Sequence, residues 1–154
     1  MRFFIQGCFG GIAVGVVFLL IGCGPPDCTV DRIYFYAEVK PLDCVLVEQN
    51  VALTRSILAR RGLATPEQFT AALAGVNVHI HAAERWQAED GTLVIGTYYP
   101  GGDINVNRHM QGFLHEVLHL LDYKNGTWRP EHEEWREVGY VEASIEYHAN
   151  LVKL

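Results

Sequence analysis

Two histidines and a glutamate stand within five residues of the chain, in the stretch His115-Glu116-Val117-Leu118-His119. Residues four positions apart on an α-helix lie one above the other, so the His115 and His119 rings can bind the same divalent cation. We expect the Glu116 carboxylate to face a water molecule at that cation, to accept its proton and to pass the proton to a leaving amine. The spacing therefore predicts a hydrolytic Zn²⁺ site.

The flanking residues are typical of a buried helix running from Asn107 to Asp122, with Asn107 as its N-terminal cap. Burying His115, Glu116 and His119 in such a helix costs free energy unless a partner satisfies them, and one bound cation satisfies all three. The alternative is that these histidines are ordinary core or surface residues with backbone partners. Apolar residues cover most of the predicted helix circumference: Phe113, Leu114, Val117, Leu118 and Leu121.

A catalytic zinc ion usually has three protein ligands and one position open to water. Two residues are candidates for the third ligand, His132 and Glu142. His132 follows a predicted turn at 123–126 and opens a second predicted helix, whose start is marked by Pro130 and several glutamates. If His132 and Glu142 lie on that one helix, they point about 80° apart, and both could lie near the metal. We favour His132 and keep Glu142 as the alternative.

The His115–His119 stretch and the later His132-Glu133-Glu134-Trp135 resemble zincin metalloproteases, in particular the SprT-like and related small zincins. This resemblance covers about residues 76–150 and implies zinc ligation through three histidines. It also implies an edge strand beside the active-site helix that binds extended peptide by strand addition. The stretch 142–146 resembles instead the gluzincin motif, in which Glu142 would bind zinc and Glu146 would hydrogen-bond to a ligand histidine.

Other polar residues are candidates for supporting roles. Asp122 falls on the ligand face of the predicted helix and could accept a hydrogen bond from the far N–H of a ligand imidazole, although an ordinary aspartate at a helix end has the same position. The oxyanion of a tetrahedral intermediate needs a hydrogen-bond donor. Five side chains are candidates for that donor: Tyr98, Tyr99, Tyr123, Tyr140 and His148.

The start of the chain has the three-part pattern of an export signal, with Arg2 followed by an apolar run from Gly10 to Ile21. The tetrapeptide at 20–23 resembles the bacterial lipobox, which implies cleavage before Cys23 and lipidation of its sulfur. The alternative is an uncleaved transmembrane anchor, but the run is shorter than the ~20 residues that span a bilayer. We therefore predict a signal peptide at 1–22 and an exported lipoprotein on the periplasmic face of the outer membrane or the cell surface.

The composition predicts a monomer with one compact domain, at 31–154, after a tether at 23–30. With 18 acidic and 12 basic residues, the net charge is -6 and no basic stripe is present, which excludes nucleic acid as a natural partner. After export, Cys28 and Cys44 are the two cysteines that have been neither removed nor lipidated. We expect them to form a disulfide with each other, which would stabilise the fold by about 3 kcal/mol.

The order of predicted elements gives an α+β fold: a small zincin-like domain in which a short mixed or antiparallel sheet packs against the His115–His119 helix and further helices. Alternation in 76–81 places His79 and His81 on the polar face of a strand, where we interpret them as surface residues. Residues 97–99 and 104–106 are the candidates for the edge strand. The predicted strands are 31–39, 76–81, 92–97 and 103–106, and the predicted earlier helices are 44–61 and 65–74.

The sequence leaves three functions open. The first is a zinc metallopeptidase that acts on a peptide or protein substrate. The second is a lipoprotein that binds zinc, or has a structural role in the cell envelope, without catalysis; four protein ligands on the metal would favour it. The third is an adhesion or assembly role at the membrane surface that uses no metal.

Overall fold

The computed structural model of the 154-residue chain describes residues 24–88, 90–129 and 132–151. The predicted signal peptide at 1–22 and the predicted lipidation site Cys23 lie outside the described residues. Within the described ranges, none of the helices has both the length and the apolar character needed to cross a membrane.

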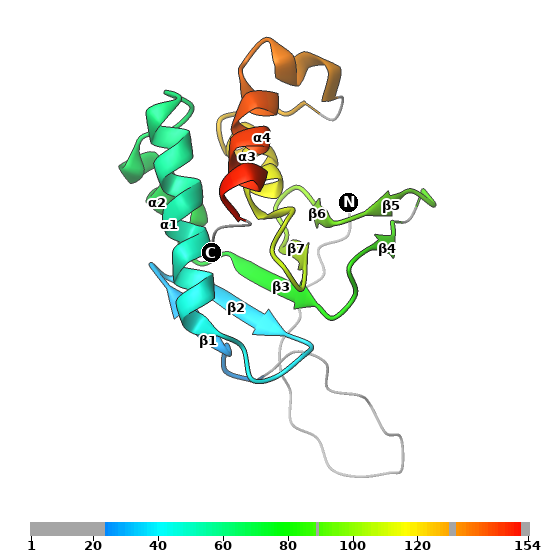
Figure 1. The fold of residues 1–154 in the computed structure, drawn as a ribbon. Helices are drawn as coiled ribbons and strands as arrows, with labels where there is room; N and C mark the ends of the chain where they lie inside the picture. Colours follow the sequence, from blue (N-terminus) through cyan, green and yellow to red (C-terminus); the bar gives the residue numbers. More distant parts are fainter. Residues whose placement is uncertain (1–23, 89, 130–131, 152–154) are drawn as a thin grey trace, which may run out of the picture.

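A five-stranded mixed sheet forms one layer of the molecule, with the strand order β1-β2-β3-β7-β6 (Figure 1). The three inner strands are parallel to one another, and the edge strands β1 and β6 are antiparallel to their neighbours. Two further short strands, β4 (Trp86–Gln87) and β5 (Leu93–Val94), form a separate hairpin just before β6. The sheet strands are β1 (Cys28–Val30), β2 (Ile33–Ala37), β3 (Asn77–His81), β6 (Gly96–Tyr98) and β7 (Ile104–Asn107).

The helices gather on one side of this sheet (Figure 1). Helix α1 starts where the Asp43 side chain accepts hydrogen bonds from two backbone N–H groups, and α2 starts at a capping box between Thr65 and Gln68. Helix α3 contains the His115–His119 motif and packs against β6 and β7. The helices are α1 (Cys44–Arg60), α2 (Pro66–Leu73), α3 (Phe113–Lys124), the short 3₁₀ helix η1 (His132–Arg136) and α4 (Tyr140–Leu151).

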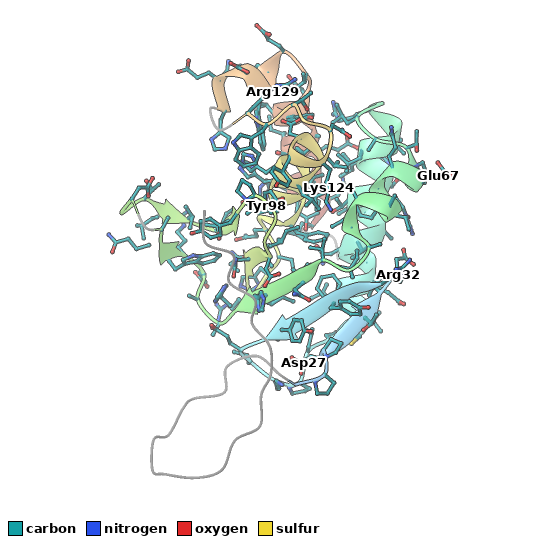
Figure 2. All side chains as sticks on the ribbon, turned by 180° about the vertical axis from the view of Figure 1, so that it is seen from behind. Asp27, Arg32, Glu67, Tyr98, Lys124 and Arg129 are labelled. Atoms are coloured by element: carbon teal, nitrogen blue, oxygen red, sulfur yellow. The ribbon has the colours of Figure 1, made fainter. Side chains whose placement is uncertain are left out.

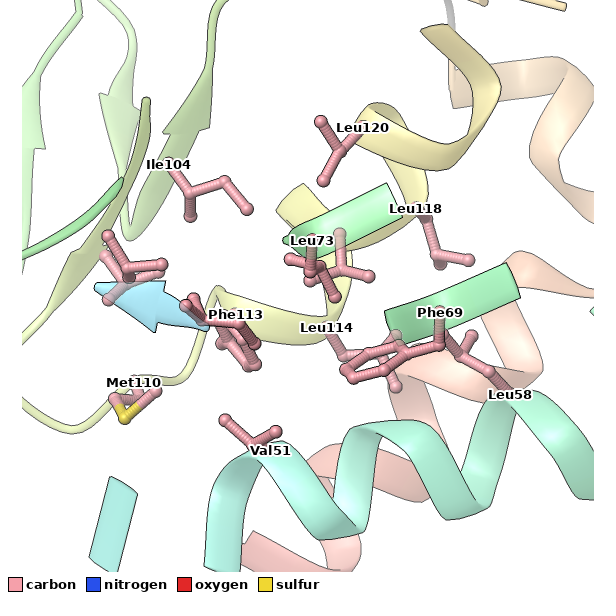
Figure 3. Close-up of a cluster of buried hydrophobic side chains, with 14 of the residues drawn as sticks. Val51, Leu58, Phe69, Leu73, Ile104, Met110, Phe113, Leu114, Leu118 and Leu120 are labelled. Atoms are coloured by element: carbon pink, nitrogen blue, oxygen red, sulfur yellow. The ribbon is translucent and has the colours of Figure 1, made fainter. Parts of the chain in front are cut away.

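The hydrophobic core lies between the sheet and the helices (Figure 3). Alternation along β3 decides which side chains enter it, because Val78 and Ile80 are buried while His79 and His81 lie on the opposite face. There His79 pairs with Asp103, so both histidines are surface residues as predicted. The core residues labelled in Figure 3 come from α1, α2, β7, the following loop and α3: Val51, Leu58, Phe69, Leu73, Ile104, Met110, Phe113, Leu114, Leu118 and Leu120.

The mixed α/β class and the two earlier helices agree with the sequence prediction, but one edge-strand candidate and two boundaries were wrong. Residues 104–106 belong to β7, which lies between β3 and β6 and is not an edge strand. Helix α3 begins at Phe113 and not at Asn107, because Asn107 ends β7 and its side chain accepts the Gln111 N–H of an intervening turn. The predicted tether also ended too late, since Cys28–Val30 form β1 and are part of the sheet. Three residues were too short a run to identify as a strand from alternation.

Cys28 and Cys44 lie side by side, one in β1 and the other at the first residue of α1. In the structure both are thiols. Burial, followed by the hydrogen bond with Cys44, raises the pKa of Cys28 to about 12. The predicted disulfide therefore joins two residues that are already neighbours, and it stays a prediction.

In an oxidising medium we expect Cys28 and Cys44 to form a bridge that raises the free energy of unfolding by about 3 kcal/mol, because it lowers the conformational entropy of the unfolded chain. Urea unfolding with and without a reductant measures this difference. Cys28→Ser is the control, since its stability should not respond to the reductant. Two titratable thiols in oxidised, folded protein would contradict the prediction.

Candidate metal centre

Three histidine side chains converge next to the sheet edge. His115 and His119 come from adjacent turns of α3, and His132 comes from the start of η1. Their ring centroids form a nearly equilateral triangle, with sides of 4.9, 4.9 and 5.1 Å. One ligand nitrogen from each ring lies within 4.8 Å of the other two. The tertiary fold therefore brings together the two helix histidines and the favoured third ligand.

The spacing of these nitrogens can be compared with that of a tetrahedral zinc site. Zn–N bonds of 2.0–2.1 Å at tetrahedral angles place two ligand nitrogens about 3.3 Å apart. The Nε2 atoms of His119 and His132 are 3.1 Å apart, which is close to that value. The three ligand nitrogens lie within 4.8 Å of one another. For a pair at that upper limit, one ring would have to move inward by about 1 Å or more to reach the tetrahedral spacing. The donor set fits a divalent transition metal with an imidazole-rich site.

Burial keeps the imidazoles of His115 and His119 neutral, which is the form that binds metals. Burial, followed by the neighbouring His119 and His132, lowers the pKa of His115 to about 3. Burial, followed by His132, lowers the pKa of His119 to about 4. Without a bound cation, protonating any of these rings would place a charge in a poorly solvated cluster of like groups.

Trp135 closes one face of the histidine triangle. Its ring centroid lies 4.4 Å from that of His115, 4.5 Å from that of His119 and 4.9 Å from that of His132. The indole is 2% exposed. Because Trp135 follows His132 by three residues in η1, the same short helix provides both a candidate ligand and the apolar wall behind it. Water can therefore reach the triangle from the opposite side.

Glu116 lies between the triangle and β6. Its side chain is 4% exposed, and burial raises its pKa to about 8. A Cβ atom at Gly96 would be only 2.7 Å from Glu116 Oε1 and 2.9 Å from its Cγ. Gly112 makes a second close contact, since a Cβ there would be 3.0 Å from the Gly96 Cα. Two glycines thus allow the edge strand and the start of α3 to approach closely, with the Glu116 carboxylate packed against the strand backbone.

A cleft of about 370 Å³ opens over these groups. One wall is the edge strand β6 with the β4–β5 hairpin, and the other includes Trp128, which stacks at 5.4 Å from His119 and 6.1 Å from Tyr98. Figure 2 labels Tyr98 on β6 and Arg129 on the segment after α3, on either side of this region. The cleft-lining residues are Ala88, Asp90, Val94, Gly96, Thr97, Tyr98, Tyr99, His115, Glu116, His119, Trp128 and His132.

The alternative ligand Glu142 is not part of the histidine cluster. The sequence analysis placed His132 and Glu142 on one helix, but the chain forms two: η1 ends at Arg136 and α4 begins at Tyr140. Glu142 is an exposed residue in the first turn of α4. Among the described residues, three histidines make up the cluster, and no carboxylate joins them as a fourth candidate ligand.

Both predicted supporting acids have other partners. Glu146 forms ion pairs with Arg60 and Arg61 on α1, where two guanidinium groups lower the pKa of its carboxyl group, so its predicted bond to a ligand histidine was wrong. Asp122 accepts hydrogen bonds from Tyr140 Oη at 2.7 Å and Thr127 Oγ1 at 3.1 Å. The buried Nδ1 atom of His119 has no hydrogen-bond partner, so the predicted bond from Asp122 to an imidazole is not made there.

The structure narrows the choice of oxyanion donor and adds residues that the sequence analysis missed. Of the five candidates, Tyr98 and Tyr99 line the cleft, whereas the Tyr140 hydroxyl donates to Asp122.

Gly96 and Trp128 were not identified from the sequence. A glycine inside a predicted strand was the signal for close backbone approach at Gly96, and nothing in the sequence distinguished Trp128 from other loop aromatics.

No family model matches this sequence, and no curated protein or solved structure is significantly similar to it. The function has to be argued from the site itself.

We expect His119→Ala to abolish zinc binding and His132→Ala to weaken it by more than about 100-fold, beyond the loss typical of residues that only support a ligand. Competition titration against a chromogenic chelator, together with elemental analysis of the purified protein, measures both. Glu142→Ala is the matched control and should bind zinc as the unaltered chain does. If Glu142→Ala loses the metal and His132→Ala retains it, the assignment of the third ligand is reversed.

Proposed function

We propose that this chain is a small zinc-dependent metallopeptidase of the zincin type, exported and held at a membrane by a lipid on Cys23. The observation that carries the proposal is the meeting of three imidazoles and one buried carboxylate in a cleft beside an edge strand. Each of these features has a defined task in hydrolysis of a peptide bond.

Zinc bound to His115, His119 and His132 would polarise the scissile carbonyl and make a water molecule more acidic. Glu116 provides the general base. Its carboxylate accepts the proton of the attacking water and then delivers it to the leaving amine. Burial alone favours the protonated form of Glu116, and a cation at the neighbouring triangle favours the carboxylate that accepts a proton. Trp135 excludes bulk water from behind the ligands.

The edge strand supports a peptide as the substrate. β6 pairs with β7 on one side only, and its residues Gly96, Thr97 and Tyr98 line the cleft together with Glu116. An extended peptide can add to such a strand through backbone hydrogen bonds, which do not depend on its sequence. The aromatic side chains of Tyr98 and Trp128 provide an apolar surface for a substrate side chain.

The non-catalytic alternative, in which zinc has a purely structural role, requires a closed coordination shell. His132 and Glu142 would both have to bind the metal, and Glu142 lies outside the cluster. A site with three histidines, an adjacent base and a cleft favours turnover over a structural role. The third possibility, adhesion without a metal, does not explain why three histidines meet beside a buried carboxylate.

Glu116→Gln should lower peptide hydrolysis by about 10²- to 10⁴-fold, because glutamine cannot accept the proton of the attacking water. Zinc content should remain near one ion per chain, since Glu116 is not a ligand. Cleavage of a peptide pool followed by mass spectrometry, with elemental analysis of the same samples, tests both expectations. Unchanged cleavage by this variant would exclude Glu116 as the base.

Gly96→Ala should displace the Glu116 side chain, because the added methyl group would lie 2.7 Å from its Oε1 atom. We expect hydrolysis to fall while zinc binding persists, together with a loss of about 1–3 kcal/mol in unfolding free energy from overpacking. Gly24→Ala is the control, since a Cβ there meets nothing within 4 Å. Full activity in Gly96→Ala would show that Glu116 does not need this contact.

A further inference from the structure

Asp122 is a buried carboxylate that does not contact the histidines and still lies at the centre of a polar network. It is in the last turn of α3 and is 2% exposed. Its Oδ1 atom accepts hydrogen bonds from Tyr140 Oη at 2.7 Å and from Thr127 Oγ1 at 3.1 Å. Its backbone carbonyl accepts the Thr127 N–H at 2.8 Å. Removing the acceptor from such a network would leave buried donors without a partner, which costs free energy.

The two partners of Oδ1 stand at the two ends of one segment of the chain. Thr127 follows the turn that ends α3, and Tyr140 is the first residue of α4. Between them lies η1, which contains His132 and Trp135. The carboxylate therefore brings Thr127 and Tyr140, the two ends of the segment 127–140, together at α3, the helix that supplies the other two candidate ligands.

Further contacts connect Asp122, η1 and the first residue of α4. Arg129 Nη1 lies 4.0 Å from Asp122 Oδ2, and Arg129 Nε lies 3.8 Å from a carboxylate oxygen of Glu134 in η1. The Trp135 ring packs edge-on against the Tyr140 ring, with centroids 5.2 Å apart. Burial and the bond to Asp122 raise the pKa of Tyr140, which keeps its hydroxyl protonated and able to donate. The indole that closes the histidine triangle thus contacts the tyrosine ring whose hydroxyl donates to Asp122.

We propose that Asp122 is a positioning residue that fastens both ends of the 127–140 segment to α3 and so holds His132 in place for the metal. This inference rests on the proposed zinc site. It differs from the usual arrangement, in which a carboxylate accepts the N–H of a ligand imidazole, because Asp122 acts here on the backbone that presents the third ligand. A loop of this length would otherwise present His132 in many orientations.

A double-mutant cycle on zinc affinity in the full chain tests the route of this effect. Asp122→Ala should weaken zinc binding by about 10- to 100-fold. The same substitution in a His132→Ala background should cause no further loss, because the ligand that it positions is already absent. Equal losses in both backgrounds would overturn the proposal and assign Asp122 to His119 instead.

Hydrogen exchange in chelator-treated protein provides a readout that needs no metal. We expect Asp122→Ala to speed exchange of the amides at 127–140 and to leave those of α1 unchanged. Unchanged exchange at 127–140 would overturn the proposal. If the unaltered chain binds no zinc, the proposed function fails, and this measurement still decides whether Asp122 fastens the segment.

Milder substitutions distinguish a specific loss of zinc affinity from a general loss of folding. Asp122→Asn should restore most of the zinc affinity, because its amide oxygen can still accept from Tyr140 and Thr127. Tyr140→Phe removes a single hydroxyl and should reproduce part of the Asp122→Ala effect in both measurements. Glu137→Ala is the matched control, since this exposed acid lies in the same segment and its side chain forms no hydrogen bond or ion pair with the described residues, and it should behave as the unaltered chain does. Full zinc affinity in Tyr140→Phe and Asp122→Ala alike would exclude the positioning role.

Discussion

The meeting of three imidazoles beside one buried carboxylate is the constraint on which the rest of this structure depends. His115 and His119 occupy adjacent turns of α3, and His132 approaches them from η1. Burial and the neighbouring imidazoles lower the pKa of His115 and that of His119, so these two rings favour the neutral form that can bind a cation between the three histidines. A cation at that position would compensate for the cost of burying these groups, which links the stability of the region to its proposed chemistry.

The close approach of the edge strand β6 to α3 places the candidate base, Glu116, beside the histidine cluster. Gly96 and Gly112 remove the side chains that would hold β6 away, and the Glu116 carboxylate fills the space between strand and helix. A carboxylate in that position faces both the histidine triangle and any chain that adds to β6. The same contact therefore positions the proposed base and the proposed substrate relative to one another.

The opposite side of the site depends on a chain segment with little regular structure. Among the described residues between α3 and α4, the five of η1 are the helical ones, and exposed side chains predominate. Its position follows from the contacts of Asp122 at its two ends and from Trp135, which packs on all three histidine rings. Rigid elements thus present two of the candidate ligands, and a fastened loop presents the third.

The sequence by itself determined the features that depend on local periodicity. The i, i+4 spacing of His115 and His119 fixes both rings on one helix face, and the capping residues of α1 and α2 mark where those helices begin. The choice between His132 and Glu142, the true partners of Asp122 and Glu146, and the contact of Gly96 with Glu116 were decided only by tertiary structure. Each depends on where the chain turns between η1 and α4, or on which strand lies at the sheet edge. Such long-range packing is set by the whole core, and spacing along the sequence does not encode it.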